Sequence, residues 1–239
     1  MCGVASRRKA EELVKNGSVK VNGKKVNDYI KIDMEDAVEV NGKIVKPRTL
    51  VYYMLNKPSG YITTKKDPQK RKTVFDLLRV EDNVFPVGRL DRDTEGLLIL
   101  TNDGELSQIL LHPRYEVKRV YEALVEGTLN EKKVKMLKDG IDLPYGYMAK
   151  MEAEIVGEKS GLSSVRISIH EGRKREIRRV FKYLGHPVLF LKRVSFGPIN
   201  LDPKIKSGKY RALTREEIDI LKEFVDKIKE MRPSKGSHP

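Results

Sequence analysis

The first 48 residues carry the hydrophobic pattern of a short helix followed by hairpins. Apolar positions within residues 4–14 fall on one helical face, and an Asn-Gly pair after them marks a stop. Alternating segments within residues 19–26 then flank Asn22-Gly23, a dipeptide favoured in tight type I′ turns, and a second such pair occurs at Asn41-Gly42. We therefore expect residues 1–48 to form a separate module of one helix and short antiparallel strands.

From residue 49 onward, strand-length apolar runs alternate irregularly with helical patterns, after a linker at Lys46-Pro47-Arg48. The expected strands are residues 50–55, 96–101, 120–126, 148–156, 163–170 and 188–194. The expected helices are residues 131–139, residues 176–184 and a terminal helix opened by a capping box at Thr214 and Glu217. This irregular order predicts an α+β fold with a mixed sheet over residues 49–231. Residues 232–239 are expected to form a flexible tail.

Charge changes the picture more than overall composition does. The chain has 48 Lys and Arg against 34 Asp and Glu, a net charge of +14, which favours a nucleic acid as partner. No apolar run approaches the about 18 residues of a membrane span, and the N-terminus lacks the apolar core of a signal peptide. Cys2 is the only cysteine, which excludes an internal disulfide or a cysteine-based metal site. We expect a cytoplasmic protein that does not bind a membrane.

Three carboxylates gather in the segment between Gly88 and Gly96, namely Asp91, Asp93 and Glu95. This spacing resembles the opening of a calcium-binding EF-hand loop, but the position of the bidentate glutamate is occupied by an asparagine and the helix-loop-helix context is missing. A metal-dependent nuclease is the related alternative. A solvated polar turn is the simplest interpretation. We expect no bound metal.

A basic segment runs from Arg166 to Arg193. It holds nine Lys or Arg and two Glu, a net charge of +7. Apolar residues recur between the charges at helical spacing, so the predicted helix 176–184 has one core face and one arginine-rich face. A solvated charged helix is one interpretation. Arginines at this density repel one another unless phosphates or a buried carboxylate receive them, which favours a nucleic-acid contact.

Four motifs, in order, resemble those of the RsuA/RluB-type pseudouridine synthases. They are Asn56-Lys57-Pro58-Ser59-Gly60, Gly88-Arg89-Leu90-Asp91-x-Asp93-Thr94-x-Gly96, Lys118-Arg119-Val120-Tyr121 and Glu171-Gly172-Arg173-x-Arg175-Glu176-Ile177-Arg178-Arg179. The segment from Gly3 to Gly23 resembles the S4 RNA-binding domain that precedes the catalytic domain in that family, though without the opening turn rich in Leu and Lys; we expect a shortened module. The resemblance covers nearly the whole chain and implies a mixed, mainly antiparallel sheet flanked by helices in the catalytic domain.

The resemblance also implies a reaction and the residues that perform it. Isomerising uridine to pseudouridine breaks the C1′–N1 bond, joins C1′ to C5 and removes the C5 proton, so it needs no nicotinamide, flavin or metal cofactor. By resemblance Asp91 is the carboxylate nucleophile, and Arg178 is its basic partner, which keeps it ionised and oriented. Tyr121 matches an active-site aromatic whose ring stacks on uracil and whose hydroxyl assists removal of the C5 proton.

The partner implied is ribosomal RNA, the large-subunit 23S RNA slightly favoured over 16S, bound by a monomer. The expected RNA contacts are Arg7, Arg8, Lys9, Lys57, Arg89, Arg173, Lys174, Arg175 and Arg179. Because the target base must be extruded from folded RNA, such backbone contacts have to offset the cost. A rival hypothesis is a non-catalytic S4-type RNA-binding protein. The joint presence of Asp91, Tyr121 and Arg178 argues against it.

Overall fold

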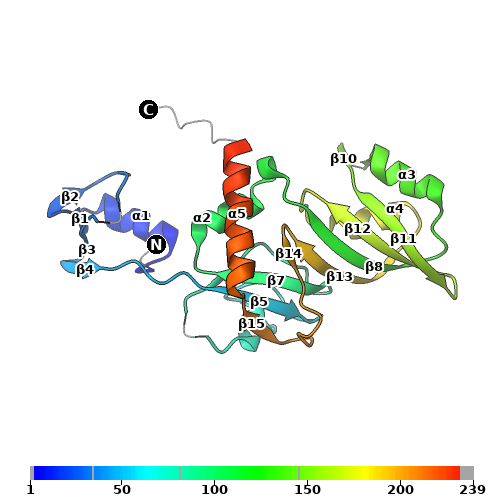
Figure 1. Cartoon of the computed structure of the whole chain (residues 1–239), viewed down its shortest axis with the longest axis horizontal. Coiled ribbons are helices and arrows are strands. Elements are labelled where there is room, and N and C mark those ends of the chain that lie inside the picture. Colours follow the sequence, from blue (N-terminus) through cyan, green and yellow to red (C-terminus); the bar gives the residue numbers. More distant parts are fainter. Residues whose placement is uncertain (1–2, 34, 81, 145, 232–239) are drawn as a thin grey trace. The chain divides into compact units, whose positions relative to one another are not determined.

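The computed structural model describes residues 3–33, 35–80, 82–144 and 146–231. The chain divides into two compact units between Leu50 and Val51, and Figure 1 labels most of the elements of both. The tail expected at residues 232–239 lies outside the described residues. No helix in the described part of the chain is long and apolar enough to cross a membrane.

The first unit holds one helix and a four-stranded antiparallel sheet of strand order β2-β1-β3-β4. Its elements are α1 (Arg7–Lys15), β1 (Val19–Val21), β2 (Lys24–Val26), β3 (Val38–Val40) and β4 (Lys43–Val45). Ser6 caps α1 by accepting the N–H of Lys9. Both residues of each predicted Asn-Gly turn have positive φ, 50° and 78° at the first turn and 51° and 77° at the second, as a type I′ hairpin requires.

The second unit is built on a nine-stranded sheet. The strands of this sheet are β5 (Tyr52–Lys57), β6 (Phe85–Pro86), β7 (Glu95–Thr101), β8 (Arg119–Glu126), β11 (Glu152–Lys159), β12 (Leu162–Ile169), β13 (Val188–Phe196), β14 (Ile199–Asn200) and β15 (Tyr210–Ala212). The strands β9 (Ile141–Leu143) and β10 (Tyr147–Ala149) form a separate two-stranded sheet. The helices of this unit are α2 (Gly104–Leu111), α3 (Glu131–Asp139), α4 (Glu176–Tyr183) and α5 (Arg215–Met231), with 3₁₀ turns η1 (Val74–Leu77) and η2 (Pro113–Tyr115).

The main sheet has the order β11-β12-β8-β13-β7-β5-β15, and β14 and β6 pair with β13 and β7. Every pairing in it is antiparallel except that of β13 with β7. This confirms the predicted mixed, mainly antiparallel sheet and the α+β class. At the parallel pair Gly96 has φ +97°, and a Cβ there would lie 2.2 Å from the carbonyl oxygen of Arg193, so only glycine fits.

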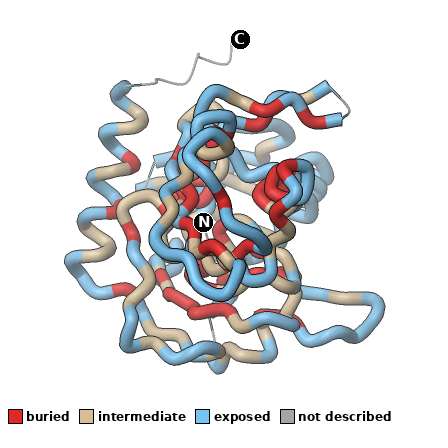
Figure 2. The backbone as a smooth tube through the Cα atoms, turned by 90° about the vertical axis from the view of Figure 1, so that its right-hand side faces the viewer, coloured by how far each residue is buried: buried red, intermediate tan, exposed pale blue. Residues whose placement is uncertain are grey.

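Both faces of the sheet are covered, which explains why β7 is a continuous apolar run. Leu98 and Leu100 belong to one buried cluster, together with apolar residues of α4, whereas Leu97 and Ile99 belong to another, together with residues of α2 and α5. Figure 2 marks the buried residues in red along the backbone. The loops that precede β7 and α4 therefore lead into elements that are packed in the buried core.

Two predictions about elements need correction. The strand expected at residues 148–156 is two strands: β10 pairs with β9 in a separate hairpin, and β11 pairs with β12 at the edge of the main sheet. The chain leaves the first pairing before Met151, whose N–H bonds to the carbonyl of Leu137. Helix α2 was not anticipated, although Asp103 caps it by accepting the N–H of Leu106. The helices expected at 131–139 and 176–184 and the terminal helix are confirmed, with α4 one residue shorter than expected.

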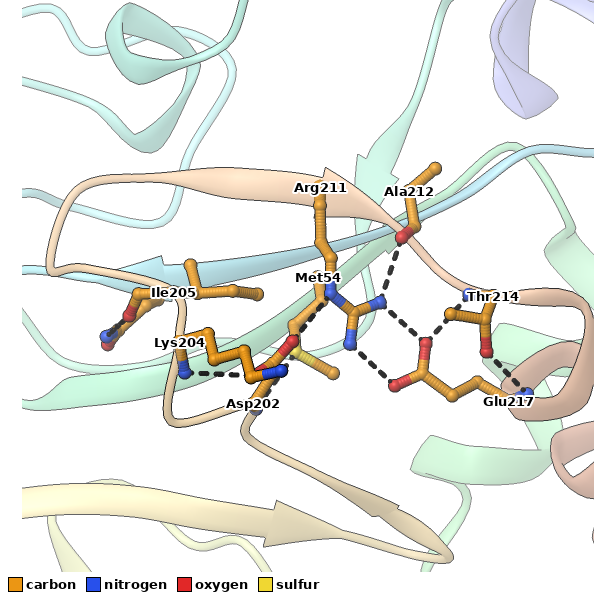
Figure 3. Close-up of polar contacts among 9 residues, drawn as sticks. Met54, Asp202, Lys204, Ile205, Arg211, Ala212, Thr214 and Glu217 are labelled. Carbon is orange, nitrogen blue, oxygen red and sulfur yellow. Dashed lines mark hydrogen bonds and ion pairs between the residues drawn. The ribbon is translucent and has the colours of Figure 1, made fainter.

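Arg211 of β15 fixes the start of α5 (Figure 3). Its guanidinium bonds Asp202 at 3.0 Å, both oxygens of Glu217 at 2.7 and 2.8 Å, and the carbonyl of Ala212 at 3.0 Å. Thr214 and Glu217 form the predicted capping box, each accepting the other's N–H. The hydrogen bonds from Arg211 hold the pKa of the Glu217 carboxyl below its ordinary value. One guanidinium thus joins the edge strand to the terminal helix.

Candidate active site

A cleft of about 960 Å³ opens in the second unit and brings together residues far apart in the sequence. Its walls include residues 88–91 and 94 of the aspartate loop (residues 88–94, before β7) and all of the arginine loop (residues 171–175, before α4). Asp91, Tyr121 and Arg178 all line it. The three residues expected to carry the chemistry therefore share one cleft.

The aspartate loop is held from beneath by Lys57. This side chain is fully buried, and its ammonium donates to the carbonyls of Pro58 at 3.0 Å, Asp91 at 3.0 Å and Thr94 at 2.7 Å, with Arg92 at 3.4 Å. Burial lowers the pKa of Lys57 to about 8, a shift that nearby carboxylates partly oppose. The expectation that Lys57 contacts RNA is therefore corrected, because its ammonium is turned into the protein and anchors the loop that carries Asp91.

The carboxylate of Asp91 is half-buried and has no hydrogen bond or ion pair with any described residue. Arg178 donates instead to the backbone carbonyl of Asp93 at 2.7 Å and to that of Val188 at 2.9 Å, and its Nε lies 3.3 Å from the Asp93 carboxylate. The expected pairing of Arg178 with Asp91 is thus not the one present. Asp91 lines the cleft, and its carboxylate, which has no partner among the described residues, lies within electrostatic reach of Arg178 and Arg175.

Asp93 joins the two loops. Arg175 donates two hydrogen bonds, of 2.9 and 3.0 Å, to the Asp93 carboxylate, which is the bidentate geometry that a guanidinium favours. Burial alone would raise the pKa of Asp93, but the bond from Arg175 and the charges of Arg178 and Arg175 hold it below its ordinary value. Arg175 adopts the left-handed conformation, with φ 52°, which is uncommon outside glycine. The bridge between the two loops therefore lies beside a strained position of the backbone.

Tyr121 and two arginines form the inner part of the cleft. Tyr121, on β8, is 7% exposed, and its ring belongs to the larger buried cluster. Arg119 and Arg193 are also buried; both donate to backbone carbonyls and place their guanidinium carbons 5.0 and 4.9 Å from the centre of the Phe196 ring. Neither forms an ion pair with a carboxylate of the described chain. These two cations were not among the predicted site residues, although charges inside alternating strands signal them.

Other expected RNA contacts divide between the units. Four of them line the cleft: Arg89, Arg173, Lys174 and Arg175. Arg179 lies exposed on α4, outside the cleft lining, with its guanidinium 5.6 Å from the Tyr147 ring. Arg7, Arg8 and Lys9 are exposed on α1 of the first unit.

The acidic cluster does not form a metal site. Asp93 is engaged by two arginines, and within the described ranges no three His, Cys, Asp or Glu side chains are placed to hold one ion. The geometric basis of the nuclease alternative, which needs Asp91, Asp93 and Glu95 around a cation, is absent from this part of the chain.

Comparisons with known proteins identify the family of the chain. Residues 51–183 match the family model described as RNA pseudouridylate synthase, and residues 3–30 match the S4 domain model. The chain belongs to the RNA pseudouridine synthase family and is a pseudouridine synthase with an S4 domain.

Individual relatives match over almost their full length. An uncharacterized RNA pseudouridine synthase of Aquifex aeolicus is 48% identical over 90% of this chain and 88% of its own. The ribosomal large subunit pseudouridine synthase B of Bacillus subtilis is 42% identical over 94% and 93%. A solved structure of a pseudouridylate synthase aligns with a TM-score of 0.68 at 28% identity and covers 90% of this chain and 94% of that one.

Proposed function

We propose that this enzyme converts uridine to pseudouridine in large-subunit ribosomal RNA, with Asp91 as the nucleophile. The observation that carries the proposal is the Asp91 carboxylate, which faces a basic cleft without a partner among the described residues while Tyr121 and Arg178 line the same cleft. A nucleophile has to be ionised and unengaged before it reacts. The name of the Bacillus subtilis relative supports the large subunit as target.

The reaction follows from these groups. Asp91 attacks C1′ as the C1′–N1 bond breaks, and the freed uracil turns within the cleft. C5 then bonds to C1′ and the bond from Asp91 is released. The Tyr121 oxygen takes the C5 proton while its own hydroxyl proton passes to water, and N1 takes a proton from water, so the base ends with as many protons as it began with. Arg178 fixes the aspartate loop through the Asp93 carbonyl and keeps positive charge close to Asp91. No step needs a metal or a redox cofactor.

Binding must offset the cost of extruding the base, about a few kcal/mol. Arg89, Arg173 and Lys174 at the cleft, with the exposed cations of α1 on the S4 unit, supply phosphate contacts for this. The enzyme is proposed to act as a monomer in the cytoplasm. The alternative, a non-catalytic RNA-binding protein, is not favoured, because binding alone has no use for the free Asp91 carboxylate.

The test measures tritium release from 23S and 16S ribosomal RNA transcripts labelled at uridine C5, with magnesium and with chelator. Wild type is expected to release tritium from 23S RNA, and Asp91→Asn to lose release by at least about 1,000-fold while still binding RNA. Asp142→Asn, an exposed aspartate on β9, is the matched control and should stay at the wild-type rate.

Each other outcome overturns a stated part of the proposal. Release from 16S RNA alone would move the target to the small subunit. An active Asp91→Asn variant would remove the assigned nucleophile. Loss of release in chelator would contradict a metal-free reaction. Intact binding with no release from either RNA would favour the RNA-binding alternative.

A further inference from the structure

Tyr147 lies beside the arginine loop but outside the family motifs and outside the described cleft lining. It belongs to the β9–β10 hairpin, which is separate from the main sheet. Its ring is flanked by two guanidinium groups, with Arg173 at 4.1 Å and Arg179 at 5.6 Å from the ring centre. Both distances lie within the range of a cation–π contact. A single half-buried tyrosine thus touches two of the cations expected to receive RNA.

The Tyr147 hydroxyl donates a short hydrogen bond to Glu176, the first residue of α4. Glu176 is only 5% exposed, and its second oxygen accepts the backbone N–H of Arg173 at 3.2 Å. The Glu176 N–H in turn donates to the Arg173 carbonyl, also at 3.2 Å. One buried carboxylate therefore connects the hairpin to the arginine loop, and the tyrosine completes that connection.

The arginine loop needs such support. Arg173, Lys174 and Arg175 are consecutive cations, and Arg175 holds a left-handed backbone conformation. Mutual repulsion and backbone strain both favour a loosened loop. The Asp93 ion pair holds its Arg175 end, and the Tyr147–Glu176 pair holds its Arg173 end.

We propose that Tyr147 is a positioning residue for RNA binding: it fixes the arginine loop in the shape that receives phosphates and takes no part in the chemistry. The inference rests on the proposed function for the identity of the ligand. Because a fixed loop loses less conformational freedom on binding, Tyr147 governs the affinity for RNA. Asp91 lies on the other wall of the cleft and is held there by Lys57, so the chemical step does not depend on Tyr147.

Two substitutions separate the ring from the hydroxyl. Tyr147→Leu removes both contacts and is expected to raise KM for labelled 23S RNA about tenfold, with kcat within about twofold of wild type. Tyr147→Phe keeps the ring between the guanidinium groups and should raise KM by only about threefold. Tyr183→Phe, at an exposed tyrosine on α4, is the matched control and should change neither constant.

Hydrogen exchange gives a readout that needs no substrate. Amides of residues 172–176 are expected to exchange about tenfold faster in Tyr147→Leu than in wild type, whereas those of β7 stay unchanged. Faster exchange with an unchanged KM would overturn the proposal, as would a fall in kcat at constant KM or an unchanged exchange rate. If wild type releases no tritium, the proposed function fails instead. Direct binding of the same RNA, measured by fluorescence anisotropy, then decides the positioning role: it stands if Kd rises about tenfold and falls if Kd is unchanged.

Discussion

Lys57 offers the sharpest test of how the site is held. We consider Lys57→Met, which keeps the length of the side chain but removes its ammonium. Carbonyls of Pro58, Asp91 and Thr94 lose a donor in a buried place, so we expect the free energy of unfolding at pH 7 to fall by about 1–3 kcal/mol. The aspartate loop loosens as well. A displacement of about 1 Å can cost about 100-fold in rate, so kcat should fall by that order while RNA binding persists.

The pH dependence of the free energy of unfolding gives a second quantity that tests the role of Lys57. Burial lowers the pKa of Lys57 from 10.5 to about 8 in the folded protein, whereas the unfolded chain keeps the ordinary value. Between these two pH values the unfolded state binds more protons, so the free energy of unfolding rises with pH, by at most about 3 kcal/mol from this group. The variant lacks this contribution. The stability difference between wild type and Lys57→Met should therefore grow between pH 8 and 10.5.

Urea unfolding of both proteins at pH 7, 8, 9 and 10 measures this difference, and tritium release at pH 7 measures the rate. Tyrosines whose pKa values are raised in the folded protein, such as Tyr52, contribute equally to the pH dependence of both proteins, so their contribution cancels in the stability difference. Lys66→Met, at an exposed lysine, is the control and should match wild type in both assays. Parallel stability curves for Lys57→Met and wild type would refute the burial argument, and a kcat within about threefold of wild type would refute the anchoring role.

Two further predictions concern ion pairs. Asp93→Asn removes the charge that two arginines share, so we expect kcat to fall about tenfold, measured by tritium release; an unchanged kcat would contradict the bridge. Glu217→Gln weakens the contact with Arg211 and should lower the free energy of unfolding by about 1–3 kcal/mol at pH 7. Because the pKa of Glu217 is lowered in the folded state, its stabilisation is present above the unfolded value near 4.5 and is lost as pH falls through the folded one. The deficit, followed by urea unfolding, should therefore shrink toward pH 3, and a constant deficit would contradict the assignment.

Elements with strong local signals were predictable from the sequence. The Asn-Gly turns need positive φ, and the caps at Asn130 and Thr214 satisfy N–H groups of their own helices, so no distant contact is required. The break between β10 and β11 was not predictable, since Met151 turns toward a carbonyl of α3 that only the folded chain brings near. The pattern of apolar and polar residues along the chain does not reveal a hydrogen-bond acceptor that is distant in the sequence.

Which residues line the cleft was predictable from the sequence, but the ion pairs between them were not. Family motifs grouped Asp91, Tyr121 and Arg178, and all three line one cleft, whereas their roles in catalysis stay predictions. Which carboxylate Arg178 meets depends on the path of the backbone between two aspartates two residues apart, and the sequence does not specify that path. Lys57 was expected to contact RNA, although a role in shaping the catalytic domain was also considered. The four carbonyls that accept from its ammonium come together only in the folded chain.

The parallel junction between β13 and β7 determines how accurately the site can be assembled. Asp91 lies on the side of β7, whereas Tyr121 and Arg178 lie on the side of β13, and the register of Lys192 with Glu95 and Arg193 with Gly96 aligns the two strands. A slip of one residue would displace Asp91, the proposed nucleophile, by about 3.3 Å relative to Tyr121 and Arg178. Because Gly96 has no Cβ, β13 and β7 can approach each other in this register. The alignment of the two sides of the site therefore depends on glycine at position 96.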